Sequence, residues 1–348
     1  MKISKEEMVN ILKQVMVATE KKGLVEELSH LVFDGAYVLT YNDKIAVSYP
    51  VSVEKFNLSC GVVATDFAAA LKGIKTKEVE LVATDNGLLI KGGNTSTTLP
   101  FFDKKKILEL HESLNIAEIE DKFVDITDEF VHGLKVCKYS ASDNMDNIKG
   151  MYAIRIDKDL MFSTNGYQAT MYPINDTGLP IVYISKTFVD AIINFLPIAA
   201  TFTKSWAFFA NKDNGILACR TSNVGKVFPQ NFNDLFLEFE DGFSFKENMD
   251  EELSSLEFFS EGEDKSDKSI NVKITTDGEC IMSSTSQKGE VLVSTEVENF
   301  TEKEDVEFFI NPNNLKEAIN SGGKMKVADR FLALNTKTFS HIASLKRK

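Results

Sequence analysis

Two helix-forming segments recur along the chain, at a period close to one third of its 348 residues. In the first type a strand leads through a polar residue into a short helix with one apolar face, and its anchors are 121 and 127 positions apart: Phe67, Phe188 and Leu315. The anchors of the second type are 122 and 123 positions apart: Met8, Phe130 and Leu253. Because a fixed internal period determines the whole architecture, we predict three similar repeats, each with two helices and several short strands.

The segments between these helices alternate apolar and polar residues and are separated by turn residues, such as Asp277-Gly278. This pattern is typical of antiparallel hairpins, so we predict an α+β fold. The predicted domains are 1–118, 119–240 and 241–348. Local signals support the helix starts. Ser4 with Glu7 forms a capping box, Thr65 or Asp66 and Ser185 are polar caps, and Pro312 is a proline in a first turn.

The charge balance restricts how this chain can contact nucleic acid. It has 39 Lys and Arg against 52 Asp and Glu, a net charge of −13, so any DNA contact must use one lysine-bearing face. Four basic residues are arginines and the other 35 are lysines, which favour diffuse attraction to phosphate over base recognition. No apolar run reaches the roughly 18 residues of a membrane span, so we expect no membrane partner. The four cysteines lack metal or disulfide spacing, which predicts free thiols in a cytoplasmic protein.

The sequence contains no recognisable catalytic or cofactor motif. The segment 321–324, Ser-Gly-Gly-Lys, lacks the first glycine of a phosphate-binding loop, and we interpret it as a helix-ending turn. The segment 143–147 resembles half of a calcium loop, but Ile148 and Ile154 stand where glycine and glutamate are needed. The four histidines form no ligand pair. We therefore expect no catalytic residue, no metal and no cofactor, and an enzyme is the least favoured interpretation.

The central repeat carries the residues of a family resemblance. An apolar strand leads into Thr164, Gly166 and Tyr167, and the segment GKVFPQNFNDLF follows at 225–236. This resembles the sliding clamp of bacterial-type DNA polymerases, the β-subunit family, whose motif is Thr-Asp-Gly-His/Tyr-Arg-Leu with a later Gly-Arg-Phe-Pro-x-Tyr. Asn165, Gln168 and Ala169 depart from that motif. The resemblance implies three tandem clamp-like domains forming half of a ring that two chains close head to tail. Because the sequence diverges from the family motif, a phage origin is one interpretation of this chain.

The resemblance further implies that the helices line a hole for double-stranded DNA, bound without sequence preference. The candidate DNA-facing residues are Lys5, Lys13, Lys21, Lys22, Lys72, Lys75, Lys77, Lys135, Lys138, Lys186 and Lys316. For each of them the alternative is an ordinary solvated lysine. The third repeat departs from the pattern, because its first helix, ENMDEELSSLEFF, is acidic.

The resemblance places ring closure at strands of the first and third repeats. The edge near 94–102 would meet the strand at 290–297 of a second copy, in a homodimer. Phe101 or Phe102 would then pack near Leu253 and Leu256 of the neighbour. The alternative is that the two phenylalanines fill the core of the first repeat.

The resemblance also implies a peptide pocket, through which a DNA polymerase and a clamp loader dock by linear motifs. Its residues would be Ile148, Thr164, Gly166, Tyr167, Gln168, Ala169, Pro229, Leu235, Phe331 and Ile342. Because Gln168 and Ala169 replace Arg and Leu, we expect an altered pocket shape. The leading expectation is a non-enzymatic processivity clamp. The alternative is a clamp-derived adaptor that binds proteins without closing a ring.

Overall fold

The computed structural model describes residues 2–20, 26–51, 58–145, 149–229, 236, 239, 241–247, 249–260 and 268–346. Over these residues the chain forms seven α-helices: α1 (Lys5–Val15), α2 (Ala64–Gly73), α3 (Lys105–Glu112), α4 (Asp128–Ser140), α5 (Val189–Phe195), α6 (Asp250–Phe259) and α7 (Pro312–Ser321). Among the helices described, none has the length and apolar character needed to cross a membrane.

The chain divides into two compact units. Unit 1 comprises Met1–Val131 and Asp176–Asn223, and unit 2 comprises His132–Asn175 and Val224–Lys348. These units do not follow the sequence repeats, because strands from successive repeats pair within one sheet. The domain limits 1–118, 119–240 and 241–348 therefore stay a prediction.

Unit 1 contains two antiparallel sheets. The larger has the order β5-β2-β3-β4-β16-β15-β14-β9, with bounds β2 (His30–Gly35), β3 (Tyr37–Tyr41), β4 (Ile45–Pro50), β5 (Leu58–Val63), β9 (Val124–Asp125), β14 (Pro197–Phe202), β15 (Trp206–Asn211) and β16 (Ile216–Arg220). The smaller has the order β1-β6-β7-β8, with bounds β1 (Lys2–Ser4), β6 (Glu78–Thr84), β7 (Gly87–Gly92) and β8 (Thr95–Leu99). Strand β13 (Val182–Ser185) precedes α5 along the chain.

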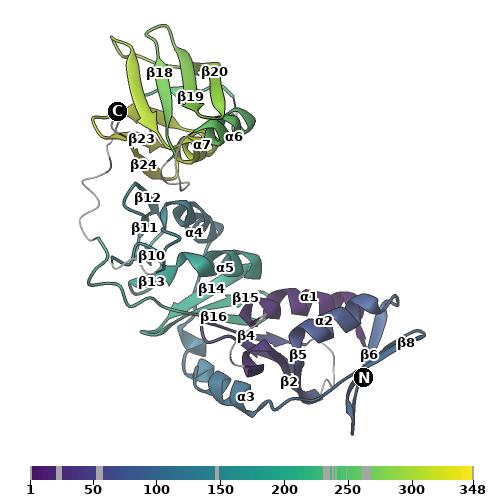
Figure 1. The fold of residues 1–348 in the computed structure, drawn as a ribbon. Helices are drawn as coiled ribbons and strands as arrows, with labels where there is room; N and C mark the ends of the chain where they lie inside the picture. Colours follow the sequence, from purple (N-terminus) through teal and green to yellow (C-terminus); the bar gives the residue numbers. More distant parts are fainter. Residues whose placement is uncertain are drawn as a thin grey trace. The chain divides into compact units, whose positions relative to one another are not determined.

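The pairing of β4 with β16 joins the first repeat to the second. Its register runs from Ser48 opposite Ile216 to Ile45 opposite Cys219. Helices α1 and α2 lie side by side (Figure 1), and α1 packs on β3 and β4. Four residues of α1 are buried, at the i, i+3, i+4 and i+7 spacing of one helix face: Met8, Ile11, Leu12 and Val15.

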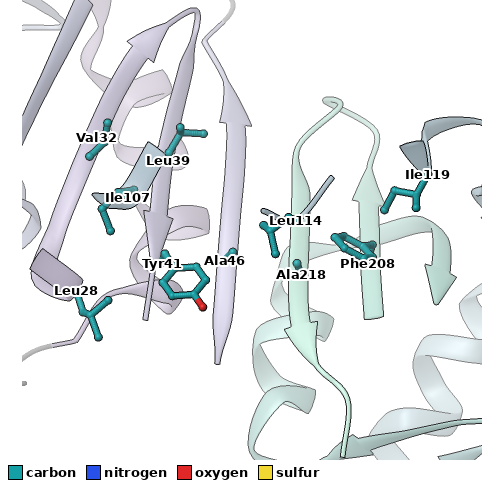
Figure 2. Close-up of a cluster of buried hydrophobic side chains, with 10 residues drawn as sticks. All are labelled: Leu28, Val32, Leu39, Tyr41, Ala46, Ile107, Leu114, Ile119, Phe208 and Ala218. Carbon is teal, nitrogen blue, oxygen red and sulfur yellow. The ribbon is translucent and has the colours of Figure 1, made fainter. Parts of the chain in front are cut away.

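Helix α3 packs on the sheet where β4 and β16 pair. Figure 2 shows one apolar cluster to which the strands of both repeats contribute, together with Ile107 of α3 and with Leu114 and Ile119 from the chain that follows it. The strands supply Val32, Leu39, Tyr41, Ala46, Phe208 and Ala218, and Leu28 comes from the turn just before β2. A helix near the end of the first repeat, together with the residues that follow it, therefore buries the junction between β4 and β16.

Unit 2 also contains two sheets. In one, neighbouring strands follow the order β10-β11-β12-β24-β23-β22, with bounds β10 (Ala153–Ile156), β11 (Leu160–Thr164), β12 (Gln168–Pro173), β22 (Lys324–Val327), β23 (Phe331–Asn335) and β24 (Ser340–Ser344). The other has the order β17-β20-β19-β18-β21, with bounds β17 (Ser244–Phe245), β18 (Ile270–Ile274), β19 (Glu279–Ser286), β20 (Gly289–Glu298) and β21 (Val306–Ile310). Here the pairing of β12 with β24 joins the second repeat to the third.

All six helices predicted from the repeat are confirmed. The Ser4 hydroxyl accepts from the Glu7 amide at 3.5 Å, Ser185 accepts from Thr187 at 3.4 Å, and Pro312 lies in the first turn of α7. The predicted cap at Thr65 or Asp66 is wrong, because α2 begins at Ala64 after an extended Val63 that makes no side-chain cap bond. The repeat did not predict α3, which has no counterpart in the other repeats.

Candidate binding surfaces

A row of paired residues crosses strands β11, β12, β24 and β23 in unit 2. Thr164 pairs with Ala169, Ala169 with Ile342, and Ile342 with Ala333. Residues directly opposite each other on neighbouring strands project from the same face of a sheet, so these four share one face. Ile342 is half-buried, and the other three are buried.

A second row lies beside the first on the same face. The Tyr167 carbonyl accepts a hydrogen bond from the Ser344 amide at 2.7 Å, and Ser344 pairs with Phe331. Phe331 and Ser344 are two positions from Ala333 and Ile342, so the period of two returns them to the same side. Tyr167 is 66% exposed, and Phe331 is half-buried. We call the surface formed by Thr164, Tyr167, Ala169, Phe331, Ala333 and Ile342 the Tyr167 face.

The turn between β11 and β12 holds Tyr167 in this position. The Asn165 side-chain oxygen accepts from the amides of Tyr167 and Gln168, both at 2.9 Å. The Thr164 hydroxyl donates to the Gln168 carbonyl at 2.8 Å and accepts from the Gly166 amide at 3.1 Å. Gly166 has φ of +91°, a conformation that favours glycine. Asn165, which departs from the family motif, is therefore the residue that organises the turn.

The opposite face of this sheet is covered by α4, and Gln168 belongs to that side. Its side-chain amide donates to the Tyr139 carbonyl at 2.8 Å, and the residue is 7% exposed. Gln168 therefore exposes little side-chain surface that a peptide in the predicted pocket could contact. On the same side the Thr170 hydroxyl lies 2.9 Å from Nδ1 of His341, and burial lowers the pKa of His341 to about 4.

Aromatic side chains close one end of the Tyr167 face. Phe162, two residues before Thr164, contacts Phe228 and Phe236 edge to face, with ring centroids 5.8 and 6.3 Å apart. Pro229 follows Phe228 and is half-buried. The sequence analysis missed Phe162 as a supporting residue, although its period-two spacing from Thr164 was a usable signal. Two predicted pocket residues, Ile148 and Leu235, lie outside the described residues.

The predicted DNA-facing lysines fall into three groups. Exposed side chains belong to Lys13, Lys72, Lys75, Lys77 and Lys135. Half-buried ones belong to Lys5, Lys138, Lys186 and Lys316. The remaining two, Lys21 and Lys22, lie outside the described residues. The Lys5 ammonium donates to the Ile74 carbonyl, and Lys316 forms an ion pair with Asp250 at 3.0 Å, so these two already have partners within the chain.

In the described part of the chain, strands β8 and β20 each present an edge that lies open over most of its length. β8 is the last strand of the smaller sheet of unit 1 and pairs with β7. β20 pairs along its length with β19, whereas on its other side β17 pairs only with Val297 and Glu298. These are the edges on which the predicted chain-to-chain joint depends.

The four predicted interface side chains differ in their exposure. Phe101 is 41% exposed. Phe102 is half-buried, donates its amide to Gly61 at 2.9 Å, and lies with its ring 4.5 Å from that of His30. Phe102 therefore packs against unit 1, whereas Phe101 stays exposed, so the core alternative fits only one of the two phenylalanines.

Leu253 and Leu256 are 1% and 0% exposed inside unit 2. Because their side chains already fill the core beneath α6, they leave no surface for a partner, and this part of the prediction needs correction. The exposed apolar side chains of α6 and β20 are Phe258, at 59%, and Leu292, at 62%. The Lys288 ammonium lies 4.6 Å from the centre of the Phe258 ring.

These sheets and helices define the α+β fold of the bacterial DNA polymerase sliding clamp, and the fold class inferred from the repeats is confirmed over the whole chain. The chain is similar to the sliding clamp of Bacillus subtilis, with a TM-score of 0.76 at 15% identity, covering 100% of this chain and 98% of that one. It is also similar to a clamp of Pseudomonas aeruginosa bound to griselimycin, with a TM-score of 0.81 at 13% identity. A third similar structure is the Helicobacter pylori β clamp bound to a DNA ligase peptide, with a TM-score of 0.79 at 13% identity. The last two matches each cover 100% of this chain and 99% of the other.

No protein-family model matches the sequence, and no curated protein matches it either. At 12–15% identity the similarity shows the fold alone. The phage origin considered from the sequence has no support among these structures.

Proposed function

We propose that the protein is a non-enzymatic DNA sliding clamp, which encircles duplex DNA and tethers a replicative polymerase in the cytoplasm. The observation that carries this proposal is the fold match over 100% of the chain, with TM-scores of 0.76 and 0.81 for the two clamps named first above. Tethering makes each rebinding of the polymerase intramolecular, at a high effective concentration. No chemistry by the protein itself is needed for this function.

The Tyr167 face is the proposed docking site for linear peptides of the polymerase and the clamp loader. Three features support it: an exposed aromatic ring at Tyr167, half-buried apolar side chains at Phe331 and Ile342, and a hydrogen-bonded turn that fixes them. A rigid apolar surface suits one or two anchor side chains, which dominate the affinity of such complexes. The Helicobacter pylori clamp, similar in fold, was crystallised with a ligase peptide.

For ring formation we propose a head-to-tail homodimer of six repeats. The open edge of β8 would pair with that of β20 in a second copy, and Phe101, Phe258 and Leu292 would be covered. Pairing removes exposed strand edges, which otherwise promote uncontrolled association, and a heterologous joint forms a ring only if it closes. Light scattering should give about 78 kDa for two chains of 38.9 kDa.

Duplex DNA would be held in the hole by lysines, weakly and without sequence preference. Each neutralised phosphate contributes about −0.9 to the slope of log K against log salt, so binding should fall steeply as salt rises. Lys13→Glu combined with Lys135→Glu should weaken binding equally for all sequences. Retention on nicked circular DNA after loading, with loss on linearised DNA, tests encirclement directly.

A second candidate function is a clamp-derived adaptor that binds proteins without closing a ring. The acidic first turn of α6, with Asp250, Glu251 and Glu252, favours it because carboxylates repel DNA. A solution mass of 38.9 kDa at micromolar concentration, together with equal loss from circular and linear DNA, would favour the adaptor over the clamp.

The docking site is tested by Tyr167→Ala. The side chain is 66% exposed, so its removal should cost little stability but remove much of the contact surface. We expect a loss of about 1–2 kcal/mol in binding of the polymerase C-terminal peptide, measured by calorimetry. Tyr37→Ala in unit 1, where the tyrosine is 47% exposed, is the matched control and should leave the affinity unchanged. Unchanged affinity in a folded, dimeric Tyr167→Ala protein contradicts the assignment.

A further inference from the structure

The helices proposed to face DNA differ in charge from repeat to repeat. The pair α1 and α2 carries three lysines against three carboxylates, and the pair α4 and α5 carries two lysines against three carboxylates, whereas the pair α6 and α7 carries one lysine against five carboxylates, a net charge of −4. The first set is Lys5, Lys13 and Lys72 against Glu6, Glu7 and Asp66, and the second is Lys135 and Lys138 against Asp128, Glu129 and Asp190, with Lys186 just before α5. The third set is Lys316 against Asp250, Glu251, Glu252, Glu257 and Glu317.

The single lysine of the third pair is held by α6. Its ammonium lies 3.0 Å from a carboxylate oxygen of Asp250 and donates to the Asp250 carbonyl at 3.4 Å and to the Ser254 hydroxyl at 3.5 Å. The same Asp250 oxygen accepts from the Asn320 side chain at 2.9 Å. A DNA phosphate would have to displace a carboxylate that is already in place and hydrogen-bonded from two sides.

The packing of these helices leaves two of the other carboxylates facing outward, whereas Glu257 pairs with Lys268 at 3.6 Å and Glu317 is half-buried. Leu253 and Leu256 of α6 and Leu315 of α7 are buried, and the two helices lie side by side (Figure 1). Glu251 and Glu252 therefore lie on the exposed side of α6, and neither forms a salt bridge with a residue that the structure describes. The exposed side of α6 at these two positions is therefore anionic.

Exposed lysines of the other repeats are in a different situation. Lys13 of α1 and Lys135 of α4 are exposed, and within the described ranges neither is engaged in a salt bridge. Such lysines can neutralise phosphates and release counterions without first breaking an internal pair.

From this contrast we infer that α6 and α7 form a DNA-repelling surface, in which the ion pair with Asp250 prevents Lys316 from binding a DNA phosphate. The attraction to DNA then comes from α1, α2, α4 and α5. The inference rests on the proposed clamp function and assigns the DNA contact within it to part of the chain. Repulsion on one side limits the total number of simultaneous phosphate contacts, which keeps the binding weak enough for sliding.

The test compares affinities for a labelled short duplex by fluorescence anisotropy between 50 and 200 mM salt. Asp250→Asn keeps the shape and the acceptor for Asn320 but frees Lys316, so it should tighten binding and steepen the salt slope by about 0.9 per lysine freed. That slope corresponds to an extra loss of affinity of about 3.5-fold between the two salt concentrations. Adding Lys316→Ala to Asp250→Asn should remove the gain.

Because Asp250 lies in the first turn of α6, its substitution could destabilise that helix, and a second acidic variant controls for this effect. Glu251→Gln with Glu252→Gln changes two exposed side chains and should also tighten binding. The double variant Asp250→Asn with Lys316→Ala removes the ion pair without changing the net charge, so it should bind DNA like the wild type, whereas Lys13→Ala should weaken binding. The inference is overturned if the double variant weakens binding as much as Lys13→Ala, or if neither acidic variant tightens it.

Retention on nicked circular DNA separates this inference from the proposed function. Retention of the wild-type protein together with unchanged affinity of the acidic variants overturns the inference alone. Loss of retention together with a Lys13→Ala variant that binds like wild type overturns both.

Discussion

Two of the buried histidines, His111 in unit 1 and His341 in unit 2, should make the protein sensitive to mild acid. Burial lowers the pKa of His341 in unit 2 to about 4, and burial lowers the pKa of His111 in unit 1 to about 4, even though its Nε2 lies 2.9 Å from the Thr40 carbonyl oxygen. Both imidazoles are therefore neutral in the folded protein at pH 5. In the unfolded chain each regains a pKa of about 6.5 and is mostly protonated at that pH.

The sign and size of the effect follow from proton linkage. A depressed folded-state pKa means that the unfolded state binds more protons, so stability is complete above pH 6.5 and falls as the pH drops toward 4. Between pH 7.5 and 5.0, each histidine should cost about 2 kcal/mol of unfolding free energy. The loss applies to both units, because His111 belongs to unit 1 and His341 to unit 2.

Urea denaturation followed by circular dichroism at the two pH values measures this loss. His341→Gln should reduce the pH dependence of the unit 2 transition by about 2 kcal/mol, and His111→Gln should do the same for unit 1. Each variant is the control for the other. Equal wild-type stability at pH 7.5 and 5.0, or an undiminished pH dependence in both variants, refutes the reasoning.

Three further predictions concern local structure. Gly87→Ala should destabilise unit 1 by about 1–3 kcal/mol, because at φ +135° its new Cβ would lie 2.0 Å from the Leu99 carbonyl oxygen. The control is Gly35→Ala, at φ +59° with no atom within 4 Å of the new Cβ, which should cost about 1 kcal/mol or less in the same urea assay. Tyr49→Phe removes the 2.8 Å hydrogen bond to the Asp213 carboxylate and should lower the stability of unit 1 by about 1 kcal/mol; an unchanged midpoint contradicts it. All four cysteines are buried and burial raises their pKa, so a thiol reagent should label the native protein slowly and the urea-unfolded protein at once; rapid native labelling contradicts the burial.

The helices were predictable because each repeat buries the same faces. Phe67 is fully buried in α2, as the repeat required. The first residue of α2 was not predictable, because an extended Val63 leads directly into the helix without a side-chain cap. Helix α3 carries its own apolar spacing at Ile107 and Leu110, continued by Leu114 just after it, but the period of the repeats gave no reason to expect a helix there.

The candidate surfaces were predictable only in part. Thr164, Tyr167 and Ile342 lie on one face because strand pairing brings together segments about 175 residues apart, and the motif alone could not show that. Strand alternation turns Gln168 to the other side. Leu253 has the same apolar character as an exposed interface residue, and its burial depends on how α6 packs, which the sequence pattern does not specify.

The sharing of sheets between repeats has a consequence for dissecting the protein. A fragment that ends at residue 118 keeps β4 but loses β16, so the backbone groups that pair Ile45–Ser48 with Ile216–Cys219 would be left unpaired at an edge. A fragment that begins at residue 241 leaves β24 without β12 in the same way. Such edges recruit strands from other molecules, so a single repeat expressed alone should aggregate. The repeated segment of sequence and the smallest soluble piece of this protein are therefore different lengths of chain.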